Sequence, residues 1–334
     1  MKIIVPMAGM GKRMRPHTLT TPKPLIPIAG KPIVQRLVED IAGMVDEKIE
    51  EVAYVIGDFG QKVEQDLADI AAGIGARSSI YYQDEPLGTG HAILCAGPSL
   101  SGNLVVAFAD TLFNADIKLD PEQDGSIWTK EVENPSSFGV VQTDANGLIH
   151  RFVEKPKEHI SNLAIIGIYY FKDGEMLRSE LQYLIDNDIK DKGEFQLTNA
   201  LENMKNKGLK LKALTVKKWL DCGNKDATVD TNREVLEMIR DEELISENAE
   251  ISNSIILKPC YIASGAKISN SVVGPSVSVG PHTLIESSVV KNSIIMNDSQ
   301  IINSNLANSM IGSHVEYEEG SHDVSIGDFS KLKL

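Results

Sequence analysis

The apolar residues in the first part of the chain fall alternately into short continuous runs and into helical repeats. The runs at residues 2–7, 52–56 and 104–109 have the length of buried strands, whereas the apolar positions of 33–44 recur at helical spacing. Pro32 stands where a proline commonly opens a helix. Strands that alternate with helices predict a doubly wound, mostly parallel α/β sheet with helices on its faces.

The pattern changes at residues 127–171, where β-rich runs follow one another without helices between them. Turn residues such as Asn146-Gly147 separate these runs, so we expect a mixed-sheet insertion over the ligand site. The helical repeat then returns and ends in a charged segment. We therefore predict a first domain at residues 1–225 and a connecting helix at 226–244.

Beyond Glu243 the composition shifts to Ile, Val, Ser, Asn and Gly, and a third spacing begins. Aliphatic residues recur at every fifth or sixth position, whereas a helix would need about 3.6 residues and a strand about 2. The repeating positions are Ile245, Ile251, Ile256, Ile262, Ile268, Val273, Val279, Ile285, Val290, Ile295, Ile301, Leu306 and Ile311. A period near six is typical of hexapeptide β-helices, in which each short strand turns one aliphatic residue inward. The alternative is a β-sandwich with accidental spacing. We expect a parallel β-helix at 245–317 and an acidic tail at 318–334.

Composition and charge narrow the possible classes of function. The chain has 334 residues, enough for two domains, and no apolar run reaches the roughly 20 residues of a membrane helix. The formal net charge of −14 argues against a nucleic-acid-binding surface. Three cysteines far apart in the sequence suggest neither a disulfide framework nor a zinc site, and they predict a cytoplasmic protein.

The first 38 residues have a charge distribution unlike that of the whole chain. They contain seven Lys or Arg residues and no Asp or Glu, although the chain has 47 acidic and 33 basic residues in total. This predicts a local positive field for an anionic ligand. The alternative is a chance cluster on a solvated face.

A glycine-containing loop, Ala8-Gly9-Met10-Gly11-Lys12-Arg13, follows the first predicted strand. Small residues there allow backbone N–H groups to approach a polyphosphate. The loop is not a P-loop, and it is not a dinucleotide-binding fingerprint because Met14 occupies the place of the third glycine. Taken alone, such a loop is more often a plain turn. Here it is followed by Pro22-Lys23-Pro24-Leu25 and by Gly30-Lys31-Pro32.

Five further segments complete a pattern that extends along the chain. They are Gln83 with Leu87-Gly88-Thr89-Gly90-His91-Ala92, then Phe108-Ala109-Asp110, Phe138-Gly139-Val140-Val141, Glu154-Lys155-Pro156 and Trp219-Leu220-Asp221-Cys222-Gly223. In this combination the sequence resembles the sugar-1-phosphate nucleotidyltransferase family, of the glucose-1-phosphate thymidylyltransferase and uridylyltransferase type. The resemblance implies a Rossmann-like catalytic domain at 1–225 and a left-handed β-helix at 245–317.

The resemblance implies that a sugar phosphate oxygen attacks the α-phosphorus of a pyrimidine nucleoside triphosphate and releases pyrophosphate. It implies that Arg13 holds the pyrophosphate, that Lys23 neutralises charge at the α-phosphate, and that Asp110 and Asp221 bind Mg²⁺. It places the nucleotide on Ala8, Gly9, Met10, Gly11, Lys12, Gln83, Gly88 and Thr89. It places the sugar phosphate on Gly139, Glu154 and Lys155.

The segments that vary between relatives indicate the substrates. Residues 87–92 resemble the uridylyltransferases most, whereas residues 163–169 lack the Asn-Thr-Gly of similar acetamido-sugar enzymes, and Asn199 stands where relatives often have Asp. We expect a hexose 1-phosphate, glucose 1-phosphate above all, with dTTP or UTP. His91 needs no role in proton transfer, because a sugar phosphate is already ionised at neutral pH.

Two alternatives stay open. The chain could be a bifunctional N-acetylglucosamine-1-phosphate uridylyltransferase and acyltransferase, with the β-helix histidines His282, His314 and His322 as candidates. However, the repeat would form fewer than four coils of roughly 18 residues, with no inserted loop to cover a thioester cofactor. The chain could also be a non-catalytic regulatory member, against which the retention of the basic and acidic residues named above argues. A stacking module at the C-terminal end also predicts a homo-oligomer.

Overall fold

The computed structural model describes residues 1–114 and 118–320, and the chain forms two compact units. The first unit comprises Met1–Pro27 and Lys31–Thr228. The second begins at Val229 and also includes the short segment Ile28–Gly30. The predicted tail at 318–334 lies for the most part outside the described residues.

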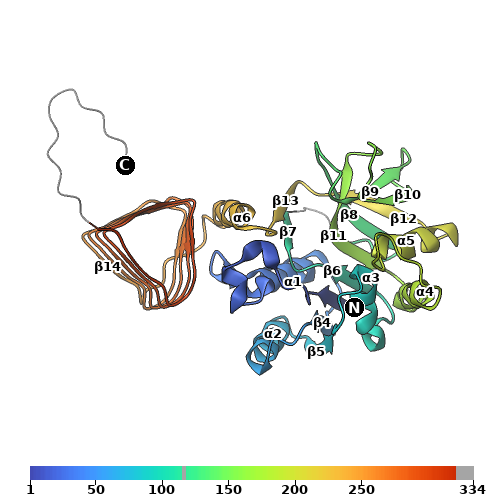
Figure 1. Ribbon diagram of the computed structural model, residues 1–334, viewed down its shortest axis with the longest axis horizontal. Coiled ribbons are helices and arrows are strands. Elements are labelled where there is room, and N and C mark those ends of the chain that lie inside the picture. Colours follow the sequence, from blue (N-terminus) through green and yellow to red (C-terminus); the bar gives the residue numbers. More distant parts are fainter. Residues whose placement is uncertain (115–117, 321–334) are drawn as a thin grey trace. The chain divides into compact units, whose positions relative to one another are not determined.

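The first unit is built on a mixed sheet with the strand order β10-β9-β11-β6-β1-β4-β5; in addition, β8 pairs with β11, and β12 pairs with β8 (Figure 1). Four strands form its parallel half: β1 (Lys2–Pro6), β4 (Glu51–Ile56), β5 (Arg77–Tyr82) and β6 (Leu104–Ala107). The other half contains β8 (Gly125–Glu131), β9 (Gly139–Thr143), β10 (Ile149–Glu154), β11 (Leu163–Phe171) and β12 (Leu211–Thr215). Strand β11 runs antiparallel to β6 and joins the halves. The predicted doubly wound sheet with a mixed-sheet insertion is confirmed.

Helices cover both faces of this sheet. They are α1 (Ile33–Met44), α2 (Gln61–Gly73), α3 (Thr89–Cys95), α4 (Gly174–Asp186) and α5 (Leu197–Asn206). Helix α6 (Lys225–Met238) begins at the end of the first unit and continues into the second. Ile4 of β1 packs in the cluster formed with α3, α4 and α5, whereas Ile3 and Val5, which point to the opposite face, are also fully buried. No helix in residues 1–114 and 118–320 is both long enough and apolar enough to cross a membrane.

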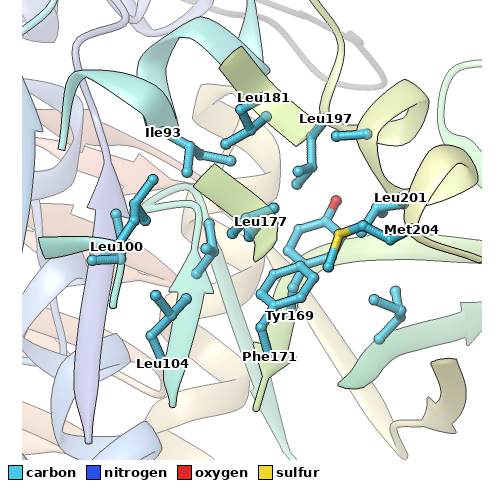
Figure 2. Packing of buried hydrophobic residues seen from close by; sticks show 14 of the residues in the cluster. Ile93, Leu100, Leu104, Tyr169, Phe171, Leu177, Leu181, Leu197, Leu201 and Met204 are labelled. Atoms are coloured by element: carbon cyan, nitrogen blue, oxygen red, sulfur yellow. The ribbon is translucent and has the colours of Figure 1, made fainter. Parts of the chain in front are cut away.

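Figure 2 shows how the apolar stripes of the helices meet the sheet. Ile93 of α3, Leu177 of α4 and Leu201 of α5 converge on Phe171 and Tyr169 of β11. Burial of each such large side chain contributes about 1.5–3 kcal/mol. This packing fixes α3 and β11, the two elements that border the site described below.

Two small sheets lie outside the main sheet. Strand β7 (Thr111–Asn114) pairs antiparallel with β13 (Lys218–Asp221), so that Asp221 lies opposite Thr111. Strands β2 (Pro27–Ile28) and β3 (Lys31–Pro32) form a short hairpin just before α1. The β7–β13 pairing joins segments more than a hundred residues apart and was not predicted from the sequence.

The second unit contains a three-sided parallel β-helix whose triangular coils are visible in Figure 1. Its strands are β14 (Glu250–Ser252), β15 (Ile255–Ile256), β16 (Cys260–Ile262), β17 (Lys267–Ser269), β18 (Val272–Val273), β19 (Val277–Val279), β20 (Leu284–Glu286), β21 (Val289–Lys291), β22 (Ser293–Ile295), β23 (Gln300–Ile302), β24 (Asn305–Ala307), β25 (Met310–Ile311) and β26 (Glu316–Glu318). The repeating aliphatic residues from Ile262 to Leu306 form its buried core, which confirms the period of five to six.

The coils are shorter than expected from the sequence. Ile251 pairs with Ile268 and Ile285 with Ile301, so one turn takes 17 residues in the first coils and 16 in the later ones, not 18. Because each turn is shorter than expected, four full turns lie between β14 and β26, whereas the sequence analysis expected fewer than four. The last strand also reaches residue 318, the first residue of the predicted tail.

Asparagines at the corners explain much of the composition of this unit. Asn253 and Asn270 adopt left-handed φ values of 45° and 50°, a conformation that asparagine tolerates better than most residues. Their side chains stack, with Asn253 Nδ2 donating to Asn270 Oδ1 at 2.6 Å. The histidines His282 and His314 are also left-handed corner residues, with φ values of 54° and 58°, and His322 lies outside the described residues.

The segment Ile28–Gly30 is held by polar and steric contacts within the second unit. The Ala29 N–H donates to Asn232 Oδ1 at 2.9 Å, and Ser278 Oγ donates to the same oxygen at 2.7 Å. Gly30 has a φ of +85°, and a Cβ there would lie 2.2 Å from the ring of Tyr261. Only glycine fits this position.

Candidate active site

A cavity of about 290 Å³ lies at the carboxyl ends of β1 and β6, where ligands gather in open α/β sheets. Its lining includes Ala8, Gly9, Gly11, Lys23, Gln83 and Asp110. Strand β1 supplies the glycine loop, and β6 leads through Phe108 and Ala109 to Asp110. Together with Glu194, segments from five parts of the sequence therefore line one cavity.

The glycine loop presents backbone to this cavity. A Cβ at Gly9 would meet nothing within 4 Å, so the main chain there is open to a ligand. Gly11 has a left-handed φ of 55°, and a Cβ there would lie 3.0 Å from Lys23 Cβ. Met10 is 59% exposed and Lys12 is also exposed. Neither is among the residues that line the cavity.

Lys23 and Asp110 form an ion pair at the cavity wall. Lys23 Nζ donates to Asp110 Oδ2 at 2.9 Å, and the side chains are 13% and 40% exposed. The low exposure of Lys23 holds its ammonium group in one place. Its charge lies within reach of any phosphate that enters beside Asp110.

The β7–β13 pairing brings Asp221 next to Asp110. The Cys222 N–H donates to the Asp110 carbonyl oxygen at 3.0 Å. Burial raises the pKa of the Asp221 carboxyl, and the charge of Asp110 raises it further, against weaker lowering by the Gly223 N–H, Lys23 and Arg13. Two neighbouring carboxylates repel each other, and a cation bound between them relieves this repulsion.

Gly223 allows Asp221 and Arg13 to approach each other. Its N–H donates to Asp221 Oδ1 at 2.9 Å. A Cβ on Gly223 would lie 2.9 Å from that oxygen and 3.2 Å from Arg13 Nη2. A side chain at residue 223 would therefore push the guanidinium group and the carboxylate apart.

Gln83 and the loop before α3 also line the cavity. Gln83 Nε2 donates to the Gly88 carbonyl oxygen at 3.2 Å and lies 3.1 Å from His91 Nδ1. Thr89 lines the cavity, but its hydroxyl donates to Gln196 Oε1 at 3.2 Å and accepts from the Leu197 N–H at 3.0 Å. Thr89 is thus engaged in fixing α5 against α3.

Gly139 of β9 pairs with Glu154, the last residue of β10, and Lys155 follows directly; none of the three is among the residues that line the cavity. A Cβ on Gly139 would lie 3.1 Å from Glu154 Oε2, and Thr198 Oγ1 donates to the same oxygen at 3.2 Å. Lys155 has a left-handed φ of 41°, and its ammonium group lies 3.8 Å from Glu154 Oε1. This group of residues offers a carboxylate and an ammonium to a second ligand.

Tyr169 of β11 connects the two groups of residues. Burial raises the pKa of its hydroxyl, and the charges of Glu154 and Asp110 raise it further. The hydroxyl therefore stays protonated and lies within the field of both carboxylates. Its ring packs edge-on against Phe108, which lines the cavity.

Two carboxylates fit magnesium better than a softer metal. The described residues contain no cluster of three or more His, Cys, Asp or Glu side chains that could hold a metal. Magnesium is commonly bound by one or two carboxylates together with substrate phosphates and waters. Asp110 and Asp221 provide this kind of donor set, all of it oxygen.

Comparison with known proteins decides the family. A family model described as Nucleotidyl transferase matches residues 2–238, and a model described as GlmU-like, C-terminal hexapeptide matches residues 226–303. The first match covers more than two thirds of the chain. The chain belongs to the nucleotidyl transferase family.

Similar proteins and a similar crystal structure are named as enzymes that act on sugar phosphates or nucleotide sugars, or as bifunctional proteins. The "Bifunctional protein GlmU" of Methanocaldococcus jannaschii is 31% identical over 264 residues, which cover 77% of this chain and 60% of that protein. The "Glucose-1-phosphate thymidylyltransferase" of Streptomyces antibioticus is 29% identical over 290 residues, covering 79% of this chain and 78% of the relative. A crystal structure of UDP-glucose pyrophosphorylase complexed with UDP-glucose has a TM-score of 0.58 at 26% identity, covering 71% of this chain and 98% of that one. The chain thus spans about 60% of the length of the GlmU proteins it matches.

Three residues of this nucleotidyl transferase site were not singled out from the sequence. Glu194 lines the cavity, Thr198 donates to Glu154, and Tyr169 is a buried tyrosine whose pKa both Glu154 and Asp110 raise. Tyr169 and Thr198 are part of an apolar strand and of a helix start, where their types are ordinary. Nothing in their neighbouring residues distinguishes them from ordinary strand and helix positions.

Proposed function

We propose that the chain is a magnesium-dependent sugar-1-phosphate nucleotidyltransferase that forms a nucleoside diphosphate sugar and pyrophosphate. The observation that carries the proposal is that Asp221 and Arg13 lie near Lys23 and Asp110, two residues that line a cavity together with the open glycine loop. Paired carboxylates beside fixed cations suit a phosphoryl-type transfer, in which catalysis is positioning and charge neutralisation.

The nucleotide triphosphate would lie along the glycine loop with its base toward Gln83. An oxygen of the sugar phosphate attacks the α-phosphorus, a new P–O bond forms, and the bond to the pyrophosphate breaks. Lys23 neutralises charge at the α-phosphate, and Arg13 holds the pyrophosphate as it takes up the electron pair. No general base is needed because the attacking phosphate is already ionised.

Magnesium held by Asp110 and Asp221 would supply charge neutralisation and orientation of the phosphate oxygens. The remaining side chains act on the second substrate. Glu154, fixed by the Thr198 hydroxyl, accepts hydrogen bonds from sugar hydroxyls, and Lys155 binds the sugar phosphate. The left-handed backbone of Lys155 directs that residue out of the strand it follows.

We propose a hexose 1-phosphate, in the first place glucose 1-phosphate, with dTTP or UTP. The names of two relatives, a glucose-1-phosphate thymidylyltransferase and a UDP-glucose pyrophosphorylase, support this choice. The test is a pyrophosphate-release screen of four nucleotides against several sugar 1-phosphates. Release that requires both a pyrimidine nucleotide and glucose 1-phosphate is expected; equal release without any sugar phosphate would refute transfer.

A bifunctional enzyme is the second candidate, favoured by the match of residues 226–303 to a GlmU-like hexapeptide model. In the described coils, His282 and His314 are corner residues with left-handed backbone, which is a sufficient reason for their positions. Acetylation of an amino-sugar phosphate from acetyl-CoA by the intact chain would establish the second activity. We expect none.

A further inference from the structure

Two residues with left-handed backbone form the turn between β2 and β3. Ala29 has a φ of 46° and Gly30 a φ of 85°. A two-residue hairpin turn with positive φ at both positions is usually made by Asn-Gly, because alanine is disfavoured in this conformation. Ala29 is also only 3% exposed, so water has little access to its backbone. The turn therefore depends on contacts from outside the hairpin.

Asn232 of α6 supplies the polar contact to this turn. The Ala29 N–H donates to Asn232 Oδ1 at 2.9 Å. Because a backbone N–H can only donate, the side-chain atom that faces it must be the oxygen. Asn232 is fully buried, and its Nδ2 has no hydrogen-bond partner among residues 1–114 and 118–320. A buried NH₂ group without a partner costs stability, so the oxygen is the half of this side chain that supports the fold.

A residue of the β-helix binds the same oxygen. Ser278 Oγ of β19 donates to Asn232 Oδ1 at 2.7 Å. The ring of Tyr261 lies so close to Gly30 that a Cβ there would be 2.2 Å from it. The segment Ile28–Gly30 is consequently part of the second unit, although the residues on both sides of it belong to the first.

Backbone hydrogen bonds connect this turn with Lys23. The Ile33 N–H donates to the Ile26 carbonyl oxygen at 3.1 Å, which closes the hairpin. The Ile26 N–H donates in turn to the Lys23 carbonyl oxygen at 3.1 Å. Lys23 is the residue whose ammonium group pairs with Asp110 at the cavity wall. A change in the turn would therefore be transmitted to Lys23.

On the basis of the proposed function, we propose that Asn232 is a positioning residue for Lys23. By holding the Ala29 turn, Asn232 sets the place of the Lys23 ammonium group, and Ser278 makes the β-helix part of this support. The second unit then contributes to catalysis. Because Lys23 acts at the α-phosphate, its displacement should slow the transfer step and leave the sugar phosphate site intact.

The experiment compares substitutions within the second unit. Asn232→Leu keeps the volume of the side chain and removes its oxygen, and Ser278→Ala removes the hydroxyl that binds this oxygen. Thr283→Val is the matched control, because Thr283 is fully buried in the β-helix and donates to the Met296 carbonyl oxygen at 2.7 Å, away from the turn. Thermal melts define an assay temperature at which every variant is folded.

The position of Lys23 is measured without substrates. The full-length protein is treated with acetic anhydride, and mass spectrometry gives the rate of acetylation at Lys23 relative to Lys62, whose side chain is 84% exposed. Asn232→Leu should raise this relative rate about threefold to fivefold, as expected for release of a partly solvated ion pair. Ser278→Ala should raise it less, and Thr283→Val should leave it unchanged.

Turnover with glucose 1-phosphate and dTTP or UTP is the second measurement. Asn232→Leu should lower kcat about 10- to 100-fold, the effect of a small misplacement of a catalytic group, with the KM of glucose 1-phosphate unchanged. In the Lys23→Ala background, Asn232→Leu should lower kcat by no more than about twofold, because the group that it positions is absent.

Three results would overturn the assignment. They are a folded Asn232→Leu variant with wild-type acetylation and kcat, losses in kcat that multiply with those of Lys23→Ala, and equal changes in Thr283→Val. Wild-type behaviour of Ser278→Ala would overturn the part given to the β-helix. If acetylation at Lys23 rises as expected but the wild-type protein forms no nucleotide sugar, the proposed function fails while the positioning of Lys23 by Asn232 stands.

Discussion

Replacement of Asp110 by Asn should separate activity from stability. The Asn side chain keeps the shape of Asp110 and still accepts from Lys23, but it removes the charge. The lost ion pair is partly solvated, with Asp110 40% exposed, so it contributes about 0–1 kcal/mol. Relief of the repulsion that raises the pKa of Asp221 acts in the opposite direction. The free energy of unfolding should therefore change by less than about 1 kcal/mol.

Turnover should fall far more than stability. If the Asp110 charge holds the cation that neutralises the transition state, Asp110→Asn should lower kcat about 10²- to 10³-fold, or about 3–4 kcal/mol. The magnesium concentration for half-maximal rate should rise. Asp66→Asn is the matched control, because it breaks a Lys–Asp pair with a 2.6 Å contact to Lys62 on α2.

The pH dependence of stability gives an independent check. A carboxyl whose pKa is raised in the folded state destabilises the fold when it is ionised. This destabilisation disappears as the pH falls through the raised pKa toward 3.8, the ordinary pKa of an Asp carboxyl. In wild-type protein with chelator, Asp221 should therefore add stability on acidification from neutral pH. In Asp110→Asn the gain should be smaller, because burial alone then raises the pKa of Asp221.

The double variant tests whether the carboxylates act through one ion. Asp110→Asn and Asp221→Asn should be strongly non-additive in kcat, since the second change removes a ligand from a site that the first has already emptied. Steady-state rates at saturating magnesium and melts in chelator measure the two effects. Losses that simply multiply, or near-normal turnover of Asp110→Asn, would refute a shared cation site.

Substitutions at three other positions test separate parts of the account. Arg13→Ala should cut kcat about 10²- to 10³-fold, and Arg13→Lys should recover only part of it because the planar fork is lost; near-normal turnover of Arg13→Ala would contradict the pyrophosphate role. Gly223→Ala should lower kcat with little change in melting temperature, because its Cβ would lie 2.9 Å from Asp221 Oδ1; full activity would argue against this contact. Asn232→Ala should cost about 1–3 kcal/mol in denaturant unfolding, since the buried Ala29 N–H loses its acceptor; an unchanged midpoint would contradict it.

The sequence was sufficient to predict those parts of the structure that short-range patterns determine. The five-to-six-residue period predicted the β-helix because every coil repeats the same burial requirement. Asp110 could be placed at the carboxyl end of a strand because an apolar run ends immediately before it. Such features depend on neighbouring residues alone.

Features that depend on distant contacts were not predictable in the same way. The resemblance implied that Asp110 and Asp221 meet at one magnesium ion, but no local pattern of the sequence specifies the register between β7 and β13 on which their proximity depends. The influence of both Glu154 and Asp110 on the pKa of Tyr169 depends on how β11 joins the halves of the sheet. The 16- and 17-residue coils likewise reflect how corner residues close each turn.

The fate of isotope-labelled oxygen tests the central claim most directly. Glucose 1-phosphate labelled in its non-bridging phosphate oxygens would be incubated with magnesium and dTTP or UTP, and both products analysed by mass spectrometry. Attack of the sugar phosphate on the α-phosphorus predicts that all of the label enters the nucleotide sugar and that the pyrophosphate carries none. Label in the pyrophosphate, or a nucleoside monophosphate in place of the nucleotide sugar, would contradict the account.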